Sequence, residues 1–380
     1  MDWTAEMISD SVSRGTVVDN PERFRPRVAF VTQAIDPSDP VLGFTAQWIT
    51  SLAARCSHIA VIANEVRNLP DVFSAEVISL GKETGAGRFR RGFRYQLALA
   101  RLQREGPLDA LIAHMCPIYL TLAAPLTRFF GIRTLLWYAH PSNSRELAVA
   151  EKVADKIITS LPGSYPRPNT KVEIVGQAID VARFRSSSTS QSERPVIFLA
   201  LGRTSRSKGF TDIIRAMAIV CQQTQAVLEI IGPSTTDTEK QHRRKLVQLA
   251  ENLGLKRVVH VRGGVPPSEI PDILHSCHVL INATVARSGD KAVFEAMAAG
   301  RPVLVSNPSF EQLLAGYREI LMFEGRDIVD LAEKMLRLAD MNPHERSDIG
   351  KELRARVEAN HSIDGWSERV ISLVAELANR

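Results

Sequence analysis

Residues 195–217, with the sequence PVIFLALGRTSRSKGFTDIIRAM, contain the pattern that organises the whole chain. An apolar run ends at Leu201, Gly202 permits a close turn, and a helical pattern begins near Lys208 and Gly209. A strand followed by a glycine turn and a helix is the repeating half of a βαβ unit. Because the strand is apolar throughout, it is typical of a parallel sheet that is covered on both faces.

The same alternation of strands and helices extends in both directions from this stretch. Towards the C-terminus the predicted strands are 226–232, 257–263, 278–284 and 301–306, and the predicted helices are 236–252, 290–299, 327–340, 344–358 and 362–378. Towards the N-terminus the predicted strands are 27–33, 58–64, 75–80, 108–114, 132–140 and 155–160, and the predicted helices are 41–55, 89–104 and 118–130. The pattern predicts an α/β protein with parallel sheets.

A polar segment divides this pattern into two domains of similar size. The sequence RSSSTSQSER, between Phe184 and Pro195, is rich in Ser and Thr and contains no apolar residue, which is typical of a linker. We therefore expect two Rossmann-like, doubly wound domains that face a cleft, in agreement with a length of 380 residues. The expected parts are a mobile leader (1–26), an N-terminal domain (27–185), a linker (186–194) and a C-terminal domain (195–360).

The composition excludes several classes of protein. With 44% hydrophobic and 23% charged residues, the chain is neither a disordered segment nor a collagen nor a coiled coil. The net charge of +5 indicates a bias towards anions such as a nucleotide, a phosphate or a membrane surface, and it is too small for a nucleic-acid-binding protein. We therefore expect no nucleic acid among the partners.

The four cysteines and the N-terminal sequence bear on the location of the protein. Cys56, Cys116, Cys221 and Cys277 lie far apart without a Cys-X-X-Cys pair, which argues against disulfides and structural zinc and favours a reducing cytoplasm. The first 27 residues lack the apolar centre of a signal peptide, and no stretch reaches 18 apolar residues. Any membrane contact is therefore expected to be peripheral.

The loop after residues 195–201 is the strongest candidate for a binding site. Arg203, Lys208, the turn at Gly202 and the positive end of a helix dipole converge after one strand, which suits a diphosphate. The alternative is that both cations are solvated charges flanking a helix. The loop lacks the motifs GxxxxGK[ST] and GxGxxG, which disfavours a P-loop ATPase and a dinucleotide-dependent dehydrogenase.

A second candidate is Glu295, in the stretch SGDKAVFEAMAAGRPVLVS (288–306). The glutamate follows a predicted strand and lies in an early turn of a predicted helix, where its carboxylate can accept two hydrogen bonds from a vicinal diol such as a ribose. The alternative is an exposed glutamate that favours the helix. The small and apolar neighbours of Glu295 favour the first interpretation, because an unpaired acid is costly to bury among them.

The region from Ala200 to Val305 resembles the nucleotide-sugar-binding domain of family 4 retaining glycosyltransferases, which have the GT-B fold. The matching pieces occur in the order of the family: GRTSRSKGF, AVLEIIGP, LAENLGLKRVVHVRGGVP, EIPDILHSCHVLINAT and KAVFEAMAAGRPVLVS. A weaker similarity covers the N-terminal half, in the stretch VTQAIDPSDPVLGFTAQWITSLAARC and in WYAH, EKVADKIITS and GQAIDVARF. The resemblance implies sugar transfer from a nucleoside diphosphate sugar with retention of anomeric configuration.

The resemblance also implies roles for individual residues. Arg203 and Lys208 would bind the donor diphosphate and stabilise the leaving charge, and Glu295 would bind the ribose. Gly43 matches a loop glycine that approaches the donor phosphates, and His140 matches a histidine near the reacting sugar. No Asp-X-Asp motif occurs in the sequence, so we expect neither a metal ion nor a cofactor.

One departure from the family pattern concerns the donor sugar. The family often has two glutamates separated by seven residues, and Arg287 occupies the position of the first. Asp290 is the candidate to replace the missing carboxylate, and the reversed charge of Arg287 could favour an acidic donor sugar.

Two histidines are candidates for the acceptor side of the site. His140 follows the apolar run TLLWYA and His114 ends the run LIAH, so both are predicted at strand ends that face the cleft. For a single histidine the alternative is a structural role in the core.

The predicted helix around 88–104 is a candidate for membrane contact. It contains Arg88, Arg90, Arg91, Arg94, Arg101 and Arg104 interleaved with Phe and Leu, and a basic amphipathic helix can lie on an anionic membrane. The alternative is a helix that covers the sheet and exposes a basic face to solvent.

Together these features predict a metal-independent, retaining glycosyltransferase of the hexosyltransferase type. Its acceptor would be a glycan or a lipid-linked molecule in polysaccharide or glycolipid biosynthesis, in the cytoplasm or peripherally at the inner face of the membrane. In the GT-B fold, the last helix (361–380) is expected to pack back on the N-terminal domain. The alternatives are a non-catalytic sugar-nucleotide-binding protein and a sugar-nucleotide epimerase or phosphorylase of the same architecture.

Overall fold

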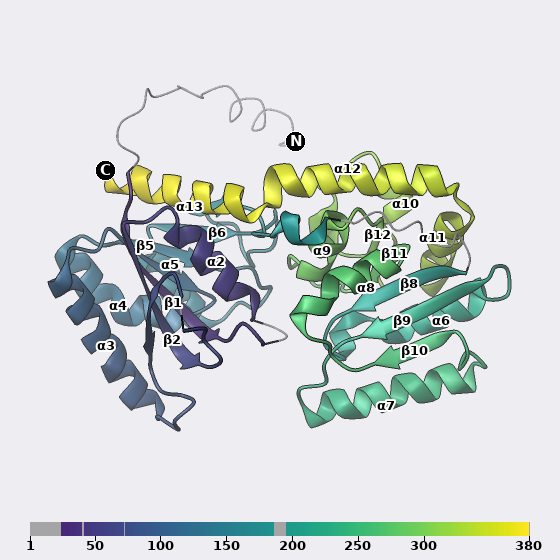
Figure 1. Cartoon of the computed structure of the whole chain (residues 1–380), viewed down its shortest axis with the longest axis horizontal. Helices are drawn as coiled ribbons and strands as arrows, with labels where there is room; N and C mark the ends of the chain where they lie inside the picture. Colours follow the sequence, from purple (N-terminus) through teal and green to yellow (C-terminus); the bar gives the residue numbers. More distant parts are fainter. Residues whose placement is uncertain (1–23, 40–41, 72, 186–194, 380) are drawn as a thin grey trace.

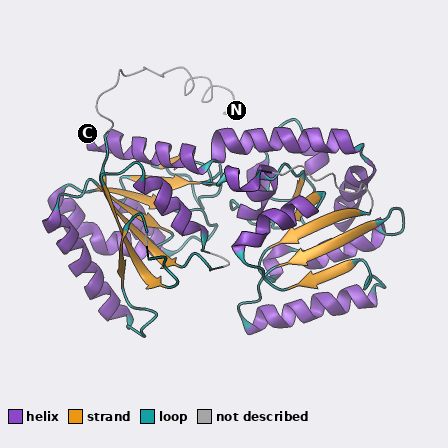
Figure 2. Ribbon diagram, in the orientation of Figure 1, coloured by secondary structure: helices purple, strands orange, loops and turns teal. Residues whose placement is uncertain are grey.

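The computed structural model describes residues 24–39, 42–71, 73–185 and 195–379. Two bodies, each built around a parallel sheet, lie side by side and are spanned along one edge by the last two helices (Figure 1, Figure 2). The predicted fold class, two Rossmann-like domains of the GT-B type, is confirmed. The predicted linker (186–194) and residues 1–23 of the predicted leader lie outside the described residues.

The N-terminal domain contains a seven-stranded sheet in the order β3-β2-β1-β4-β5-β6-β7, with every neighbouring pair parallel. The strands are β1 (Arg27–Ile35), β2 (His58–Val66), β3 (Glu76–Ser79), β4 (Ala110–His114), β5 (Arg133–Trp137), β6 (Lys156–Thr159) and β7 (Val172–Ile174). The strand order reverses direction between β1 and β4, and this is the point where sheets of this kind bind ligands.

Helices cover both faces of this sheet because side chains of a strand alternate between its faces. In β1, Val28 and Phe30 join a core with α2 (Phe44–Ala53), whereas Ala29 and Val31 join the core on the opposite face. The opposite face is covered by α3 (Arg88–Glu105), α4 (Pro117–Phe130) and α5 (Arg145–Val153). The near-continuous apolar sequence of the strands follows from this double coverage.

The C-terminal domain contains a five-stranded parallel sheet in the order β10-β9-β8-β11-β12. Its strands are β8 (Val196–Leu201), β9 (Ala226–Ile231), β10 (Val259–Arg262), β11 (Val279–Asn282) and β12 (Val303–Val305). Its helices are α6 (Phe210–Val220), α7 (Asp237–Asn252), α8 (Ile270–Ser276), α9 (Lys291–Ala298), α10 (Arg318–Leu321), α11 (Ile328–Asp340) and α12 (Pro343–His361). Here the strand order reverses between β8 and β11.

The last helix, α13 (Ile363–Ala378), crosses from the C-terminal domain to the N-terminal one (Figure 1). The chain leaves α12 at Ser362, whose side chain accepts a hydrogen bond from the Gly365 amide and caps α13. Trp366 is 1% exposed, and its ring centroid lies 5.0 Å from that of Trp48 on α2 and 5.7 Å from that of Trp137 in β5. The last helix is therefore part of the hydrophobic core of the N-terminal domain.

The structure differs from the sequence-based elements in several places. Strand β7 and helices α5 and α8 are short elements for which we predicted no structure. Strand β5 ends at Trp137, three residues before the predicted end, because the following segment leads into Pro141 and a polar run that caps α5 at Ser144. His140 therefore lies in a loop beyond the strand.

Candidate active site between the two domains

A cleft of about 780 Å³ lies between the two domains. It is lined by loops that follow β1, β8, β9, β10 and β11, all at the carboxyl ends of their strands. The position agrees with the rule that open parallel sheets bind ligands where the strand order reverses. The lining residues that carry a formal charge are Asp39, Arg183, Arg203, Lys208, Asp290, Lys291 and Glu295.

All six residues predicted to bind the donor line this cleft. They are Gly43, Gly202, Arg203, Lys208, Asp290 and Glu295. They come from both domains and from positions that are up to 252 residues apart in the sequence. Their binding roles remain predictions, and their convergence makes this cleft the candidate active site.

The loop after β8 depends on two glycines. Gly202 has φ +144° and Gly209 has φ +66°, conformations that side chains with a Cβ atom adopt at a cost. A Cβ atom on Gly209 would lie only 2.6 Å from the Cβ of Ala283, so this glycine also permits close contact with the loop after β11. Between the glycines, a short 3₁₀ turn (Arg206–Lys208) directs the chain into α6.

Lys208 and Asp290 form an ion pair between the loops that follow β8 and β11. The Asp290 carboxylate also accepts hydrogen bonds from Asn282 Nδ2 at 2.7 Å and Thr284 Oγ1 at 3.3 Å. Burial alone would raise the pKa of Asp290, but the Lys208 ammonium and these hydrogen bonds together lower it. Asp290 is therefore a carboxylate that fixes the lysine at the cleft wall.

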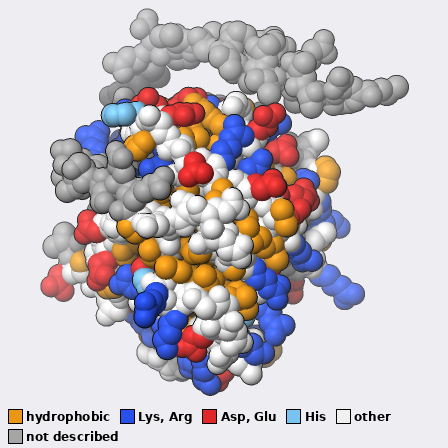
Figure 3. Space-filling model, turned by 90° about the vertical axis from the view of Figure 1, so that its right-hand side faces the viewer, with side chains coloured by type: hydrophobic (Ala, Val, Ile, Leu, Met, Phe, Trp, Pro, Cys, Tyr) orange, Lys and Arg blue, Asp and Glu red, His pale blue; other side chains and the backbone are white. Residues whose placement is uncertain are grey.

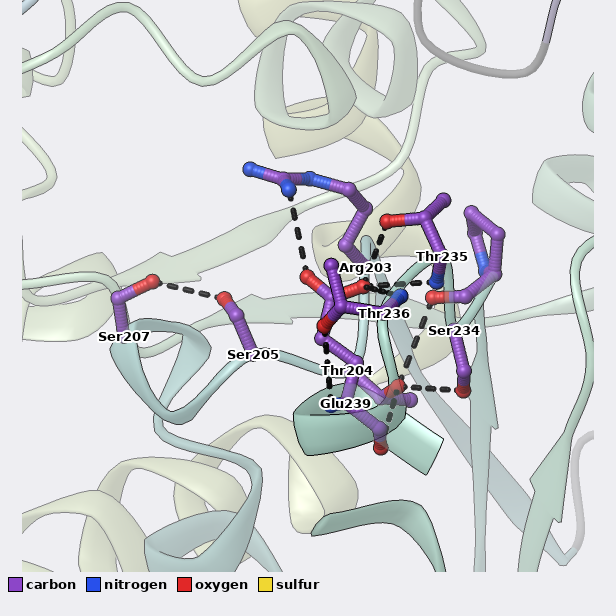
Figure 4. Close-up of polar contacts among 9 residues, drawn as sticks. Arg203, Thr204, Ser205, Ser207, Ser234, Thr235, Thr236 and Glu239 are labelled. Carbon is purple, nitrogen blue, oxygen red and sulfur yellow. Dashed lines mark hydrogen bonds and ion pairs between the residues drawn. The ribbon is translucent and has the colours of Figure 1, made fainter. Parts of the chain in front are cut away.

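Arg203 is paired in a similar way with Glu239, which is a residue that the sequence analysis did not single out (Figure 4). Arg203 Nη1 lies 3.2 Å from Glu239 Oε1, while Glu239 Oε2 accepts bonds from the amide and hydroxyl of Thr235 at 2.8 and 2.7 Å. The hydrogen bonds from Thr235 and the charge of Arg203 lower the pKa of Glu239 despite its burial. Glu239 also completes the capping box of α7 with Thr236, so the start of this helix positions the arginine.

Glu295 lies on α9, one turn from Lys291, and the two side chains form an ion pair. The Glu295 side chain is 14% exposed, so this partner compensates for part of its desolvation. The Lys291 ammonium also lies 5.3 Å from the centre of the Phe44 ring, which belongs to α2 of the other domain. The i, i+4 spacing of Lys291 and Glu295 is a signal that the sequence analysis did not use.

Gly43 lines the cleft immediately before α2. Its amide donates a hydrogen bond to the Asp39 carbonyl, with 2.9 Å between nitrogen and oxygen. A Cβ atom at this position would lie 2.6 Å from the same oxygen, which explains the need for glycine. The expected approach of this backbone to the donor phosphates remains a prediction, and the amide already has an acceptor in this conformation.

The two predicted acceptor-side histidines do not line this cleft. His114 is 3% exposed among Phe30, Phe44 and Trp48, and burial lowers its pKa to about 4. Its Nδ1 lies 3.0 Å from Thr32 Oγ1, so the geometry is that of a neutral core histidine. His140 is exposed, and its Nδ1 accepts a hydrogen bond from the Ser142 amide at 3.1 Å.

Arg287 occupies a different place from the one that its position in the family pattern suggests. It does not line the cleft beside Glu295, and its side chain instead lies against Gly163 of the N-terminal domain. A Cβ atom on Gly163 would be 3.6 Å from Arg287 Nη1.

Two searches of the described residues concern metals and membranes. Among them, no group of three or more His, Cys, Asp and Glu side chains has the arrangement of a metal site. In the same part of the chain, no helix is both long and apolar enough to cross a bilayer.

Residues 180–356 match the model of the family described as glycosyl transferases group 1. The C-terminal domain belongs to this family. The resemblance found in the sequence, a group 1 (family 4) glycosyltransferase of the GT-B fold, is thereby confirmed.

Curated relatives cover only part of their own length in the comparison. A D-inositol 3-phosphate glycosyltransferase of Corynebacterium jeikeium is 26% identical over 48% of this chain and 47% of its own. A UDP-N-acetylglucosamine--N-acetylmuramyl-(pentapeptide) pyrophosphoryl-undecaprenol N-acetylglucosamine transferase of Geobacillus thermodenitrificans is 25% identical over 61% of this chain and 62% of its own. The chain thus spans about half the length of the curated relatives that it matches.

Solved structures match over almost the whole chain. A sucrose-phosphate synthase from Thermosynechococcus elongatus has a TM-score of 0.76 with 20% identity, covering 93% of this chain and 99% of its own. The Anabaena protein HepE in complex with UDP-glucose has a TM-score of 0.69 with 14% identity, covering 93% of this chain and 100% of its own. At these identities the likeness shows the fold alone.

Proposed function

We propose that the protein is a retaining glycosyltransferase that binds a nucleoside diphosphate sugar in the cleft between its domains. The observation that carries the proposal is the convergence of Arg203, Lys208 and Glu295 at the carboxyl ends of β8 and β11 in a domain of the group 1 family. The HepE structures contain UDP and UDP-glucose, which supports a uridine diphosphate sugar as the donor here.

The proposed chemistry depends on stabilising the leaving group. When the bond between the anomeric carbon and the diphosphate breaks, the electron pair remains on the phosphate oxygen, and the anomeric carbon forms its new bond with an acceptor hydroxyl. Arg203 and Lys208 would stabilise the negative charge that develops on the diphosphate, and Glu295 would hold the ribose hydroxyls. Positioned cations can do this without a metal ion. Asp290 would exchange Lys208 with the phosphate and remain close to the donor sugar.

The acceptor is proposed to be a glycan or a lipid-linked molecule at a cytoplasmic membrane face, in polysaccharide or glycolipid assembly. The names of several relatives support an acceptor of this kind, among them a pyrophosphoryl-undecaprenol and a phosphatidylinositol transferase. His140, exposed after β5, and the buried His114 stay candidates for the acceptor side only through their resemblance to the family pattern.

A membrane surface is the proposed second partner, and α3 together with α4 is its proposed contact. The two helices pack side by side, with Gln96 Nε2 donating to the Leu122 carbonyl at 2.7 Å. Their exposed large apolar residues are Phe89, Phe93 and Leu97 on α3, and Ile118, Leu122, Phe129 and Phe130 on α4. Apolar side chains beside an arginine-rich helix suit insertion into an anionic bilayer. At the opposite end of the molecule, by contrast, acidic and basic side chains are interspersed (Figure 3).

The test of the proposed activity combines donor binding with turnover. Purified protein is screened by thermal shift with uridine, guanosine and adenosine diphosphate sugars, and release of nucleoside diphosphate is then followed with the stabilising donor. We expect Arg203→Ala and Lys208→Ala to reduce release by about 10²-fold or more, since each removes a charge that stabilises the transition state. Arg244→Gln, a change at an exposed arginine of α7, is the matched control.

Two outcomes would contradict the proposal. Release at the wild-type rate in both variants would remove Arg203 and Lys208 from the mechanism. Donor binding without any release of nucleoside diphosphate would favour the alternative of a sugar-nucleotide-binding protein, and interconversion of the donor sugar would favour the epimerase.

A further inference from the structure

A second cavity, of about 610 Å³, lies beside the cleft and is also formed by both domains. Most of its wall comes from the segment of the N-terminal domain that joins β6 to β7, and Arg287 is its contribution from the C-terminal domain. The lining residues are Pro141, Thr159, Leu161, Pro162, Gly163, Tyr165, Pro166, Arg167, Pro168, Asn169, Val172, Ile174 and Arg287. We refer to this cavity as the arginine pocket.

The charges of the arginine pocket are all positive among the residues that line it. Arg167 and Arg287 are its charged lining residues, one from each domain. Arg167 Nε lies 3.0 Å from a carboxylate oxygen of Glu151, and this carboxylate also accepts a hydrogen bond from the Tyr165 hydroxyl. Within the described part of the chain, Arg287 has neither an ion pair nor a hydrogen bond. The pocket therefore presents a net positive charge.

Several buried polar atoms at the pocket have no hydrogen-bond partner in the structure. They include Arg167 Nη2 and the hydroxyl of Thr159, a residue that is only 1% exposed. The hydroxyl of Ser309 is in the same condition in a small adjoining cavity of about 230 Å³, which Arg287 and Glu311 also line. Buried donors without partners are costly, so their presence at a cationic cavity indicates a polar ligand.

The arginine pocket and the donor cleft are connected through one loop. Arg287 lines the pocket and Asp290 lines the cleft, and three residues of extended chain span at most ~11 Å. In between, Gly289 packs on the N-terminal domain so closely that a Cβ atom would lie 2.3 Å from Ser160 Oγ. A molecule held in the pocket can therefore extend a hydroxyl towards the reacting sugar.

We propose that the arginine pocket binds a phosphate group of the acceptor, held between Arg167 of one domain and Arg287 of the other. Guanidinium groups bind phosphate through paired hydrogen bonds, and the pocket adds the Thr159 hydroxyl and an apolar wall of prolines, Leu161 and Val172 for the organic part of the molecule. This inference rests on the proposed transfer activity and adds the class of acceptor. It gives Arg287, which replaces the usual glutamate, a role outside the donor site.

The test measures phosphate binding separately from donor binding. The full chain is saturated with UDP, and glycerol 3-phosphate, glycerol and inorganic phosphate are titrated in turn and followed by calorimetry. We expect glycerol 3-phosphate to bind more tightly than inorganic phosphate, and glycerol not to bind. Arg287→Gln should weaken binding of glycerol 3-phosphate at least tenfold, because the exposed side chain has no structural partner, whereas Arg244→Gln should leave it unchanged. Arg287→Lys should retain part of the affinity.

Three results would overturn the proposal: equal affinity of wild type and Arg287→Gln for glycerol 3-phosphate, equal affinity for glycerol, or inorganic phosphate binding as tightly as the organic phosphate. Repeating the titration with Arg203→Ala excludes binding of the probe in the donor cleft. UDP binding by the wild type is measured on its own. Its absence would count against the proposed donor site, whereas loss of phosphate binding counts against the pocket.

Discussion

Arg203 and Lys208 reach the cleft already paired with carboxylates, and this pairing explains how a loop holds two long side chains in place. Glu239 and Asp290 are each bound by further hydrogen bonds, so they are fixed points to which the cations attach. An ion pair at a partly buried site gains energy only when its remaining polar atoms are satisfied, as they are here. Both cations could be predicted from the glycine turn, but their partners could not.

The buried state of His114 leads to a prediction about pH. Its pKa is about 4 in the folded protein, below the ordinary value of 6.5, so the unfolded chain binds a proton more readily than the folded one. The stability from the neutral form is complete above pH 6.5 and is lost as the pH falls towards 4, where the loss approaches about 3 kcal/mol.

Urea unfolding between pH 4 and 7 measures this dependence. His114→Gln should flatten it relative to the wild type, while His140→Gln, at an exposed loop position, should not. An unchanged slope in His114→Gln would mean that the histidine is not held neutral by burial.

At the scale of single elements, α3 shows how one helix meets two requirements. Tyr95, Leu99 and Leu102 bury one face in the core, and Phe89 and Phe93, 97% and 65% exposed, lie outside it. The arginines divide in the same way. Arg91, Arg94 and Arg101 bind groups of their own domain, whereas Arg88, Arg90 and Arg104 are exposed without a partner in the described residues.

This division predicts which side chains matter for membrane binding. In co-sedimentation with vesicles, Arg88→Gln with Arg90→Gln should weaken binding to anionic vesicles about 10-fold or more, at ~1 kcal/mol for each cation near the surface. Phe89→Ser with Phe93→Ser should weaken the binding that remains at high salt, where screening removes the contribution of charge. Arg244→Gln with Lys245→Gln is the matched control on α7. Equal binding of the wild type to neutral and anionic vesicles would contradict the role of the arginines.

The whole molecule is held together by a chain that crosses twice between its domains. After building the C-terminal domain, it returns to the N-terminal one, where Ser367 Oγ lies 2.9 Å from Ser51 Oγ and Arg55 pairs with Glu368 at 3.1 Å. Across the cleft, Lys291 and Phe44 supply a cation–π contact that both domains must be close to make. Closure of the cleft and stability of the N-terminal domain are therefore linked to the C-terminal half.

Deletion of the last helix tests this dependence. Truncation after Asn360 should destabilise the N-terminal domain, because Trp48 and Trp137 lose the ring of Trp366 that covers them. The single change Trp366→Ala should cost about 3–5 kcal/mol of unfolding free energy, as for other large buried aromatic residues. Thermal unfolding measures both, with Val329→Ala, at an exposed position of α11, as the control. Unchanged melting of the truncated chain would show that α13 adds nothing to the core.

The sequence alone determined the two parallel sheets and the loop with Arg203 and Lys208. Both are encoded locally, because apolar strands, glycine turns and helix starts lie within single βα units of about 30 residues. Strand β7 and helix α5 escaped prediction because they are short and have no strong periodicity.

Only the tertiary structure decided which residues meet. Lys208 and Asp290 are 82 residues apart and become partners because β8 and β11 are neighbours in the sheet, where the strand order reverses. Arg287 stands close to Glu295 in the sequence, yet the loop after β11 turns it away from the cleft and against Gly163. His114 and His140 both seemed to end strands, and burial alone separates them, one in the core and one in solvent. A local pattern fixes the residue type and the element, but the direction of a side chain depends on contacts between elements that no local pattern contains.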